Sequence, residues 1–184
     1  MGRGRLSLKG RNKVPWLEIE RCETERTYLD HQLRTLRKLN HGELCQGELQ
    51  LVPSEGFYDR LRLRFQARPL YRVWDLLYPR DQRRISPEAL QVAGPLGAAC
   101  LWLDNGRWLS KTTGCIKGLS SLEDTLTVAE WLSDMNVPCR YDVLNGDHAQ
   151  VLLGVTGMQQ FVKLTRPLTH VSMRHKLKPP KKDP

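Results

Sequence analysis

One stretch of six residues limits the possible folds of this chain more than any other. In Arg60-Leu61-Arg62-Leu63-Arg64-Phe65, charged and apolar residues alternate strictly. Successive side chains of a β-strand point to opposite faces of a sheet, so the alternation predicts a strand with one buried and one basic face. Arginines repeated without interleaved acids repel one another unless an anion compensates them. We therefore predict a nucleic-acid-binding row of Arg60, Arg62 and Arg64; the alternative is a solvated face that only keeps the protein soluble.

The patterns on either side of this strand predict its partners. Residues 5–9 also alternate, which directs Leu6 and Leu8 to the core and Arg5, Ser7 and Lys9 outward. Residues 16–20 form a second alternating strand, and residues 48–52 pair with 57–65 around the turn at 53–56. Residues 25–39 and 69–78 have the apolar spacing of helices. The order is strand, strand, helix, strand, strand, helix.

A second copy of this order follows. The patterns predict helices at residues 95–104, 121–135 and 157–166, a strand at 108–117, and a hairpin of 139–144 with 150–155 around Asn145-Gly146-Asp147. At 184 residues, the chain is expected to form a single domain over residues 1–177, with halves of about 1–90 and 91–177. The basic residues 178–184 are expected to be a disordered tail.

The charge of the chain favours a polyanionic partner. Lys and Arg number 29 against 20 Asp and Glu, which gives a net charge of +9. No apolar run approaches the ~20 residues that span a bilayer, and the basic N-terminus lacks the apolar core of a signal peptide. We therefore expect an intracellular protein, cytoplasmic or organellar, with no membrane partner. Five cysteines without a CxxC pair indicate reduced thiols rather than a disulfide framework or a zinc site.

Residues 96–106, Leu-Gly-Ala-Ala-Cys-Leu-Trp-Leu-Asp-Asn-Gly, carry a family resemblance. This segment resembles the motif helix of LAGLIDADG homing endonucleases, in which an apolar helix of small and aromatic residues ends in acids and a glycine. Residues 74–79 with 85–87 are similar to the segment before the family's second motif, and residues 167–177 are similar to its closing segment. The three pieces occur in the family's order between about residues 28 and 177.

The resemblance implies an α+β fold and a DNA-binding surface. Family members have two αββαββα halves, or are dimers of one half, and their antiparallel strands form a concave sheet over the DNA major groove. The partner would be double-stranded DNA or a structured RNA, and the chain would be a monomer or a homodimer. The residues expected to contact it are Arg3, Arg5, Ser7, Lys9, Arg60, Arg62 and Arg64 in the first half, and Lys111, Thr113 and Arg140 in the second.

The chain departs from the family pattern where the chemistry takes place. Each family motif ends in an acid just before its glycine, and these acids bind divalent metals; here Asn105 precedes Gly106. Asp104 lies one residue earlier, and one helical position rotates a side chain by about 100 degrees. Gly2-Arg3-Gly4 resembles the end of a first motif whose helix is missing or whose start codon is set too late, with Arg3 in place of the acid.

These departures predict a binding protein with lost or impaired cleavage, which could act on RNA as a maturase does. Such a protein needs no cofactor. The first alternative is an active site-specific DNA endonuclease that uses Mg²⁺ with Asp104 or with acids of a partner chain. The second is an unrelated α+β protein with a basic surface, associated with the ribosome. Trp102 and Trp108 flank the end of the motif and are expected to pack in the core rather than to stack on bases.

Overall fold

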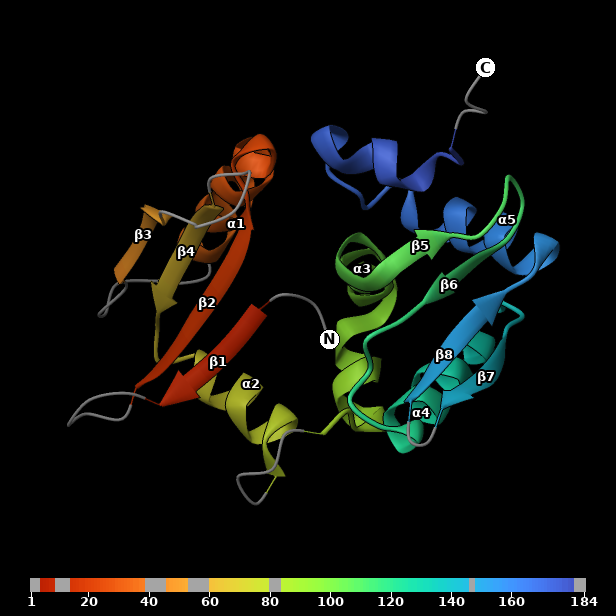
Figure 1. Ribbon diagram of the computed structural model, residues 1–184. Helices are drawn as coiled ribbons and strands as arrows, with labels where there is room; N and C mark the ends of the chain where they lie inside the picture. The colour runs from red at the N-terminus through yellow and green to blue at the C-terminus, as the bar shows by residue number, and fades with distance from the viewer. Residues whose placement is uncertain are drawn as a thin grey trace. The chain divides into compact units, whose positions relative to one another are not determined.

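The computed structural model describes residues 4–8, 14–38, 46–52, 60–79, 84–145 and 148–180, and the chain divides between Tyr78 and Pro79 into two compact units (Figure 1). Each unit contains one four-stranded antiparallel sheet with helices against it. None of the described helices is both long enough and apolar enough to cross a membrane.

The first unit holds strands β1 (Gly4–Leu8), β2 (Pro15–Cys22), β3 (Gln46–Val52) and β4 (Arg60–Gln66), in the spatial order β1-β2-β4-β3. Its helices are α1 (Arg26–Lys38), which follows the short 3-10 turn η1 (Glu23–Glu25), and α2 (Leu70–Leu77). The predicted strands and helices are therefore confirmed. The predicted turn at residues 53–56 lies outside the described residues.

The core of the first unit follows from the alternation in β4. Leu61, Leu63 and Phe65 are almost fully buried and pack with Leu29 and Leu33 of α1. Helix α1 has its apolar residues at helical spacing, so one side of it covers the sheet. The opposite face of the sheet, here named the open face, carries the polar residues of β4.

The second unit repeats the sheet of the first. It contains α3 (Pro87–Asn105), β5 (Gly106–Trp108), β6 (Gly114–Ile116), α4 (Leu122–Asp134), β7 (Arg140–Asn145), β8 (His148–Leu153), α5 (Val155–Thr165) and the 3-10 helix η3 (Val171–Leu177). The spatial order β5-β6-β8-β7 matches β1-β2-β4-β3 position for position. The predicted internal repeat is therefore confirmed at the level of topology.

Two predicted elements of the second unit have different bounds. Helix α3 begins at Pro87 rather than at residue 95, because the Ser86 side chain accepts a hydrogen bond from Ala89 N and caps it. A kink at Gly94, with φ 51°, separates this early segment from the motif helix. The predicted strand at 108–117 is two short strands, β5 and β6, separated by a turn.

The end of η3 is fastened to the motif helix. Trp102 is 1% exposed. Its ring centroid lies 5.9 Å from that of Trp108 in an edge-to-face arrangement, and its ring also contacts Phe161. Both indole nitrogens donate hydrogen bonds to the carbonyl oxygen of Lys176, at 3.0 and 3.1 Å. The prediction of core packing is confirmed for Trp102, and Leu177 is also buried. The predicted tail is described only as far as Pro180.

Candidate nucleic-acid interface

The open face of the first sheet pairs its arginines with acids of the neighbouring strand. Arg62 Nε donates to Glu20 Oε1 at 2.7 Å, and Arg64 Nε donates to Glu18 Oε1 at 3.0 Å. The register explains this, because Glu20 lies directly across from Arg62 and Glu18 directly across from Arg64. The expectation that no acids interleave these arginines is wrong: the acids come from β2.

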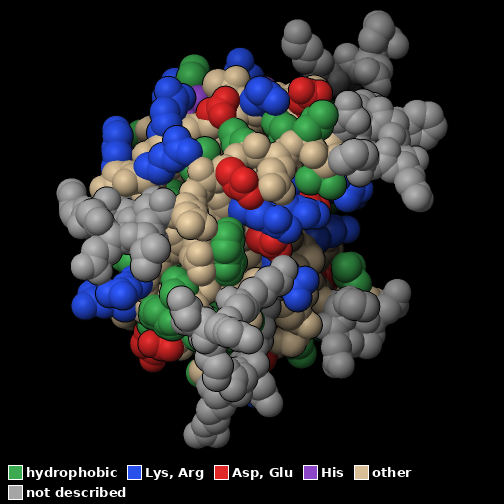
Figure 2. All heavy atoms as spheres, turned by 90° about the vertical axis from the view of Figure 1, so that its left-hand side faces the viewer, with side chains coloured by type: hydrophobic (Ala, Val, Ile, Leu, Met, Phe, Trp, Pro, Cys, Tyr) green, Lys and Arg blue, Asp and Glu red, His purple; other side chains and the backbone are tan. Residues whose placement is uncertain are grey.

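The alternation of charge extends across all four strands. Arg5, Glu18, Arg64 and Glu48 are successive cross-strand neighbours on β1, β2, β4 and β3, so positive and negative groups alternate along one row. Figure 2 shows the molecule from the side on which β3 lies in Figure 1, and both basic and acidic side chains are present on that side. This face is suited to reading hydrogen-bonding groups and less suited to attracting phosphates by net charge.

Arg60 differs from the other two arginines of β4. It is exposed, and its cross-strand neighbours are Cys22 on β2 and Val52 on β3, neither of which is an acid. Its charge is therefore less compensated than that of Arg62 or Arg64.

The thiol of Cys22, which lies across from Arg60, has a lowered pKa. The main cause is a hydrogen bond from the Thr24 side chain.

The remaining predicted residues of the first half have different outcomes. Arg5 is exposed on the open face, as expected. Ser7 is on the same face but is buried, and its hydroxyl has no hydrogen-bond partner among the described residues, so its predicted place on an accessible surface is wrong. Leu8, expected in the core, is exposed. Arg3 and Lys9 lie outside the described residues.

The second sheet presents a different basic pair. The register places Arg107, Cys115, Leu152 and Arg140 in one cross-strand row over β5, β6, β8 and β7. Arg140 is therefore on the face of the second sheet that is turned away from its core, here also named an open face, as predicted. Arg107, at the opposite end of the same row, was missed. The pKa of the Cys115 thiol is raised by burial, and nearby Lys117 and Arg107 partly offset that rise. Arg107 was missed in the sequence analysis because three residues, 106–108, are too short for an alternating pattern to indicate a strand.

Lys111 and Thr113 do not lie on a strand. Both belong to the turn between β5 and β6, where the Ser110 hydroxyl accepts hydrogen bonds from the backbone of Thr112 and Thr113, each at 3.1 Å. Their predicted position on the sheet is wrong because this side-chain-to-backbone turn interrupts the expected strand. Thr113 and Arg140 line one shallow hollow beside the sheet.

Asn105 closes the junction between the motif helix and β6. Its side-chain Nδ2 donates to the backbone carbonyl oxygen of Lys117 at 2.8 Å, and the backbone carbonyl oxygen of Asn105 accepts from Lys117 N at 3.1 Å. Gly118 follows with φ 73°, and a Cβ there would lie 2.9 Å from the Asn105 amide nitrogen. The amide therefore acts as a clamp that a carboxylate could not reproduce, since a carboxylate has no proton to donate.

The donors at this position do not fit a divalent cation. Asn105 Oδ1 is buried without a hydrogen-bond partner among the described residues, so it offers one neutral oxygen. Mg²⁺ requires near-octahedral oxygen ligands and usually at least one carboxylate. Within the described ranges, no group of three or more His, Cys, Asp or Glu side chains could hold a metal ion. Asp104 is half-buried and already engaged in another interaction.

The fold of the chain is shared by solved structures of LAGLIDADG proteins. The chain aligns over 98% of its length with 82% of the homing endonuclease I-WcaI, in a structure bound to its DNA recognition sequence, with a TM-score of 0.75 and 15% identity. It also aligns with 54% of full-length DUF199/WhiA from Thermatoga maritima, and with 81% of the N-terminal LAGLIDADG domain of DUF199/WhiA; both alignments have a TM-score of 0.53 and 11% identity.

Sequence comparison adds no relative to these. No protein-family model matches the chain, and no curated protein sequence does. At these identities the likeness concerns the fold: the chain has the LAGLIDADG homing-endonuclease fold, as the resemblance of residues 96–106 implies. The alternative of an unrelated α+β fold is therefore wrong.

Proposed function

We propose that this protein binds duplex DNA on the open faces of its two sheets and does not cut it. The observation that carries the proposal is the open face of the first sheet, where guanidinium and carboxylate groups alternate across the strands. Arginine forms bidentate contacts with guanine, glutamate accepts from cytosine N4, and glutamine pairs with adenine. I-WcaI, which has the same fold, is bound to its DNA recognition sequence, and this likeness supports DNA as the partner.

The absence of cutting rests on Asn105. Its amide is committed to Lys117, and the oxygen that it leaves over carries no charge to neutralise a metal ion. Metal-assisted hydrolysis of a phosphodiester needs ions placed at both the attacking and the leaving oxygens. A protein that keeps the fold and the polar sheet, but has no cluster of metal ligands among its described residues, binds its target and releases it intact. It needs no cofactor for that task.

Removal of one acid from the open face tests how the sheet works. With Glu20→Gln, Arg62 loses its ion-pair partner and its charge becomes available to phosphates. We expect tighter binding to DNA of arbitrary sequence, a plot of log affinity against log salt that is steeper by about one unit, and weaker discrimination of the preferred sequence. Fluorescence anisotropy over a salt series measures all three.

The matched control is Glu123→Gln, which removes an equal charge from the exposed side of α4. Its binding is expected to match that of the unchanged protein. If both variants steepen the salt dependence equally, the effect is one of net charge, and the proposed role of the open face is contradicted.

Cysteine alkylation maps the bound surface. Cys22 lies across from Arg60 on the open face, and its lowered pKa favours the reactive thiolate. Saturating duplex is expected to slow alkylation of Cys22 at least about fivefold, because the DNA covers the thiol. Added glutathione is the internal control, since DNA does not cover its thiol. Peptide mass mapping after a timed pulse gives both rates; an unchanged Cys22 rate would place the DNA elsewhere.

A further inference from the structure

A groove on the second unit lies outside the sheet faces used by the proposed function. It has a volume of about 700 Å³ and runs between α5, the β5–β6 turn and the end of η3. A smaller hollow of about 360 Å³ adjoins it, because Val162, Arg166, Arg174 and Leu177 line both. We name the two together the α5 groove.

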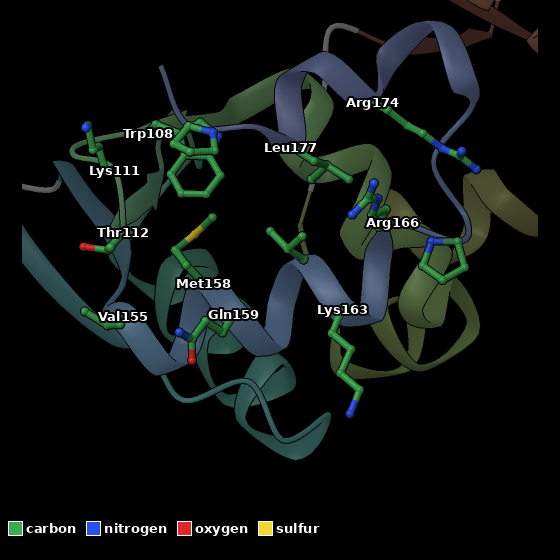
Figure 3. Close-up of a pocket in the computed structure, with 13 residues that line it drawn as sticks. Trp108, Lys111, Thr112, Val155, Met158, Gln159, Lys163, Arg166, Arg174 and Leu177 are labelled. Atoms are coloured by element: carbon green, nitrogen blue, oxygen red, sulfur yellow. The ribbon is translucent and has the colours of Figure 1, made fainter. Parts of the chain in front are cut away.

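The floor of the α5 groove is apolar. Val155, Met158 and Val162 recur at helical spacing along one side of α5, and Trp108 and Leu177 complete the floor. Figure 3 shows Trp108, Met158 and Leu177 facing the middle of the hollow. Val155 is 49% exposed, so the floor includes an apolar side chain that is in contact with solvent.

The charged residues on the rim of the α5 groove are all basic. Lys111 lies at one end and Arg166 with Arg174 at the other, as Figure 3 shows. The rim residues are Lys111, Lys163, Arg166, Arg174, His175 and Lys178, all of them exposed. The sequence from residue 148 to 180 contains no Asp or Glu at all. In contrast to the first sheet, this surface has no carboxylates of its own segment to compensate its cations.

From this combination we infer that the α5 groove binds an acidic amphipathic helix of a partner protein. Apolar side chains at i, i+3 and i+7 of such a helix would lie on the floor, and its flanking carboxylates would meet the rim. A nucleic-acid backbone would satisfy the rim but would leave the exposed apolar surface of Val155, which is 49% exposed, and of the half-buried Val162 in contact with water. A flat membrane surface could not enter a concave hollow.

Binding of a designed peptide tests the inference. The probe is a fluorescent helical peptide of about five turns, with leucines at i, i+3 and i+7 and glutamates flanking them. A scrambled peptide of identical composition and a single-stranded oligothymidylate of equal charge are the comparison ligands. The full chain is expected to bind the ordered peptide saturably, and to bind the other two more weakly.

Three variants locate the binding. The single variant Arg166→Glu is expected to weaken peptide binding at least about fivefold, and Val155→Ser about threefold. Arg72→Glu, on the exposed side of α2, is the charge-matched control and is expected to change nothing. Circular dichroism confirms that each variant is folded.

The remaining outcomes overturn the inference. Equal binding of ordered and scrambled peptides would show that charge alone acts. If Arg72→Glu weakened peptide binding as much as the groove variants do, the α5 groove would not be the binding site. The inference would also be wrong if the ordered peptide did not bind saturably. Oligothymidylate binding that the groove variants abolish, with the peptide bound no better, would assign the groove to nucleic acid.

Discussion

Replacement of Trp102 by alanine is expected to lower the free energy of unfolding by about 4 kcal/mol. The side chain is 1% exposed and packs against Trp108 and Phe161, so its removal leaves a large cavity in the core of the second unit. The variant also loses the hydrogen bond from the indole nitrogen to the Lys176 carbonyl. Urea denaturation followed by tryptophan fluorescence and circular dichroism measures the loss.

The matched control is Val92→Ala on the same helix. Val92 is 76% exposed, so its truncation is expected to change the free energy of unfolding by less than about 0.5 kcal/mol. Limited proteolysis gives an independent readout, because η3 should be cut faster in Trp102→Ala once its fastening to α3 is weakened. If both variants have the same stability, the core of the second unit is not organised around Trp102.

Restoration of the family's acid by Asn105→Asp is expected to destabilise the protein by about 3 kcal/mol and to restore no cleavage. The donor to the Lys117 carbonyl would become a carboxylate oxygen facing another oxygen at the 2.8 Å separation of the present bond. The buried position of Oδ1 means that the new charge would be poorly hydrated. Thermal denaturation measures the first effect, and incubation with DNA and Mg²⁺ measures the second.

Gln160→Glu is the control for the chemical change alone. It makes the same amide-to-acid replacement on the exposed side of α5, where it is expected to cost less than about 0.5 kcal/mol. If Asn105→Asp were as stable as this control and also cut DNA, Asn105 would occupy the position of a metal ligand without any structural role of its own. The clamp interpretation would then be wrong.

The strands and helices were predictable because their patterns are local. The alternation of Arg60 to Phe65 and the helical spacing in α1 each depend on residues a few positions apart. The turn at residues 109–113 has no Gly or Pro, and it forms because the Ser110 hydroxyl takes over backbone hydrogen bonds. The start of α3 was missed because Gly94 and Pro95 read as a helix boundary, whereas the chain kinks there and is helical on both sides.

The site was less predictable because it is built from pairs distant in sequence. Glu18 and Arg64 are 46 residues apart, and only the register of β2 against β4 brings them within hydrogen-bond distance. The sequence therefore showed a row of arginines where the structure has a row of alternating charges. The clamp of Asn105 was likewise invisible, since its partner is a backbone carbonyl 12 residues later.

The central claim is binding without cutting, and one incubation tests it most directly. The purified full chain is mixed with a random duplex DNA pool and a structured RNA pool in Mg²⁺ over a salt series, and retention and strand integrity are measured together. We predict retention that falls steeply with salt, enrichment of one set of duplex sequences, and intact strands throughout. Discrete double-strand cuts that Asp104→Asn abolishes would contradict the account and show an active endonuclease; selective retention of RNA alone would contradict DNA as the partner.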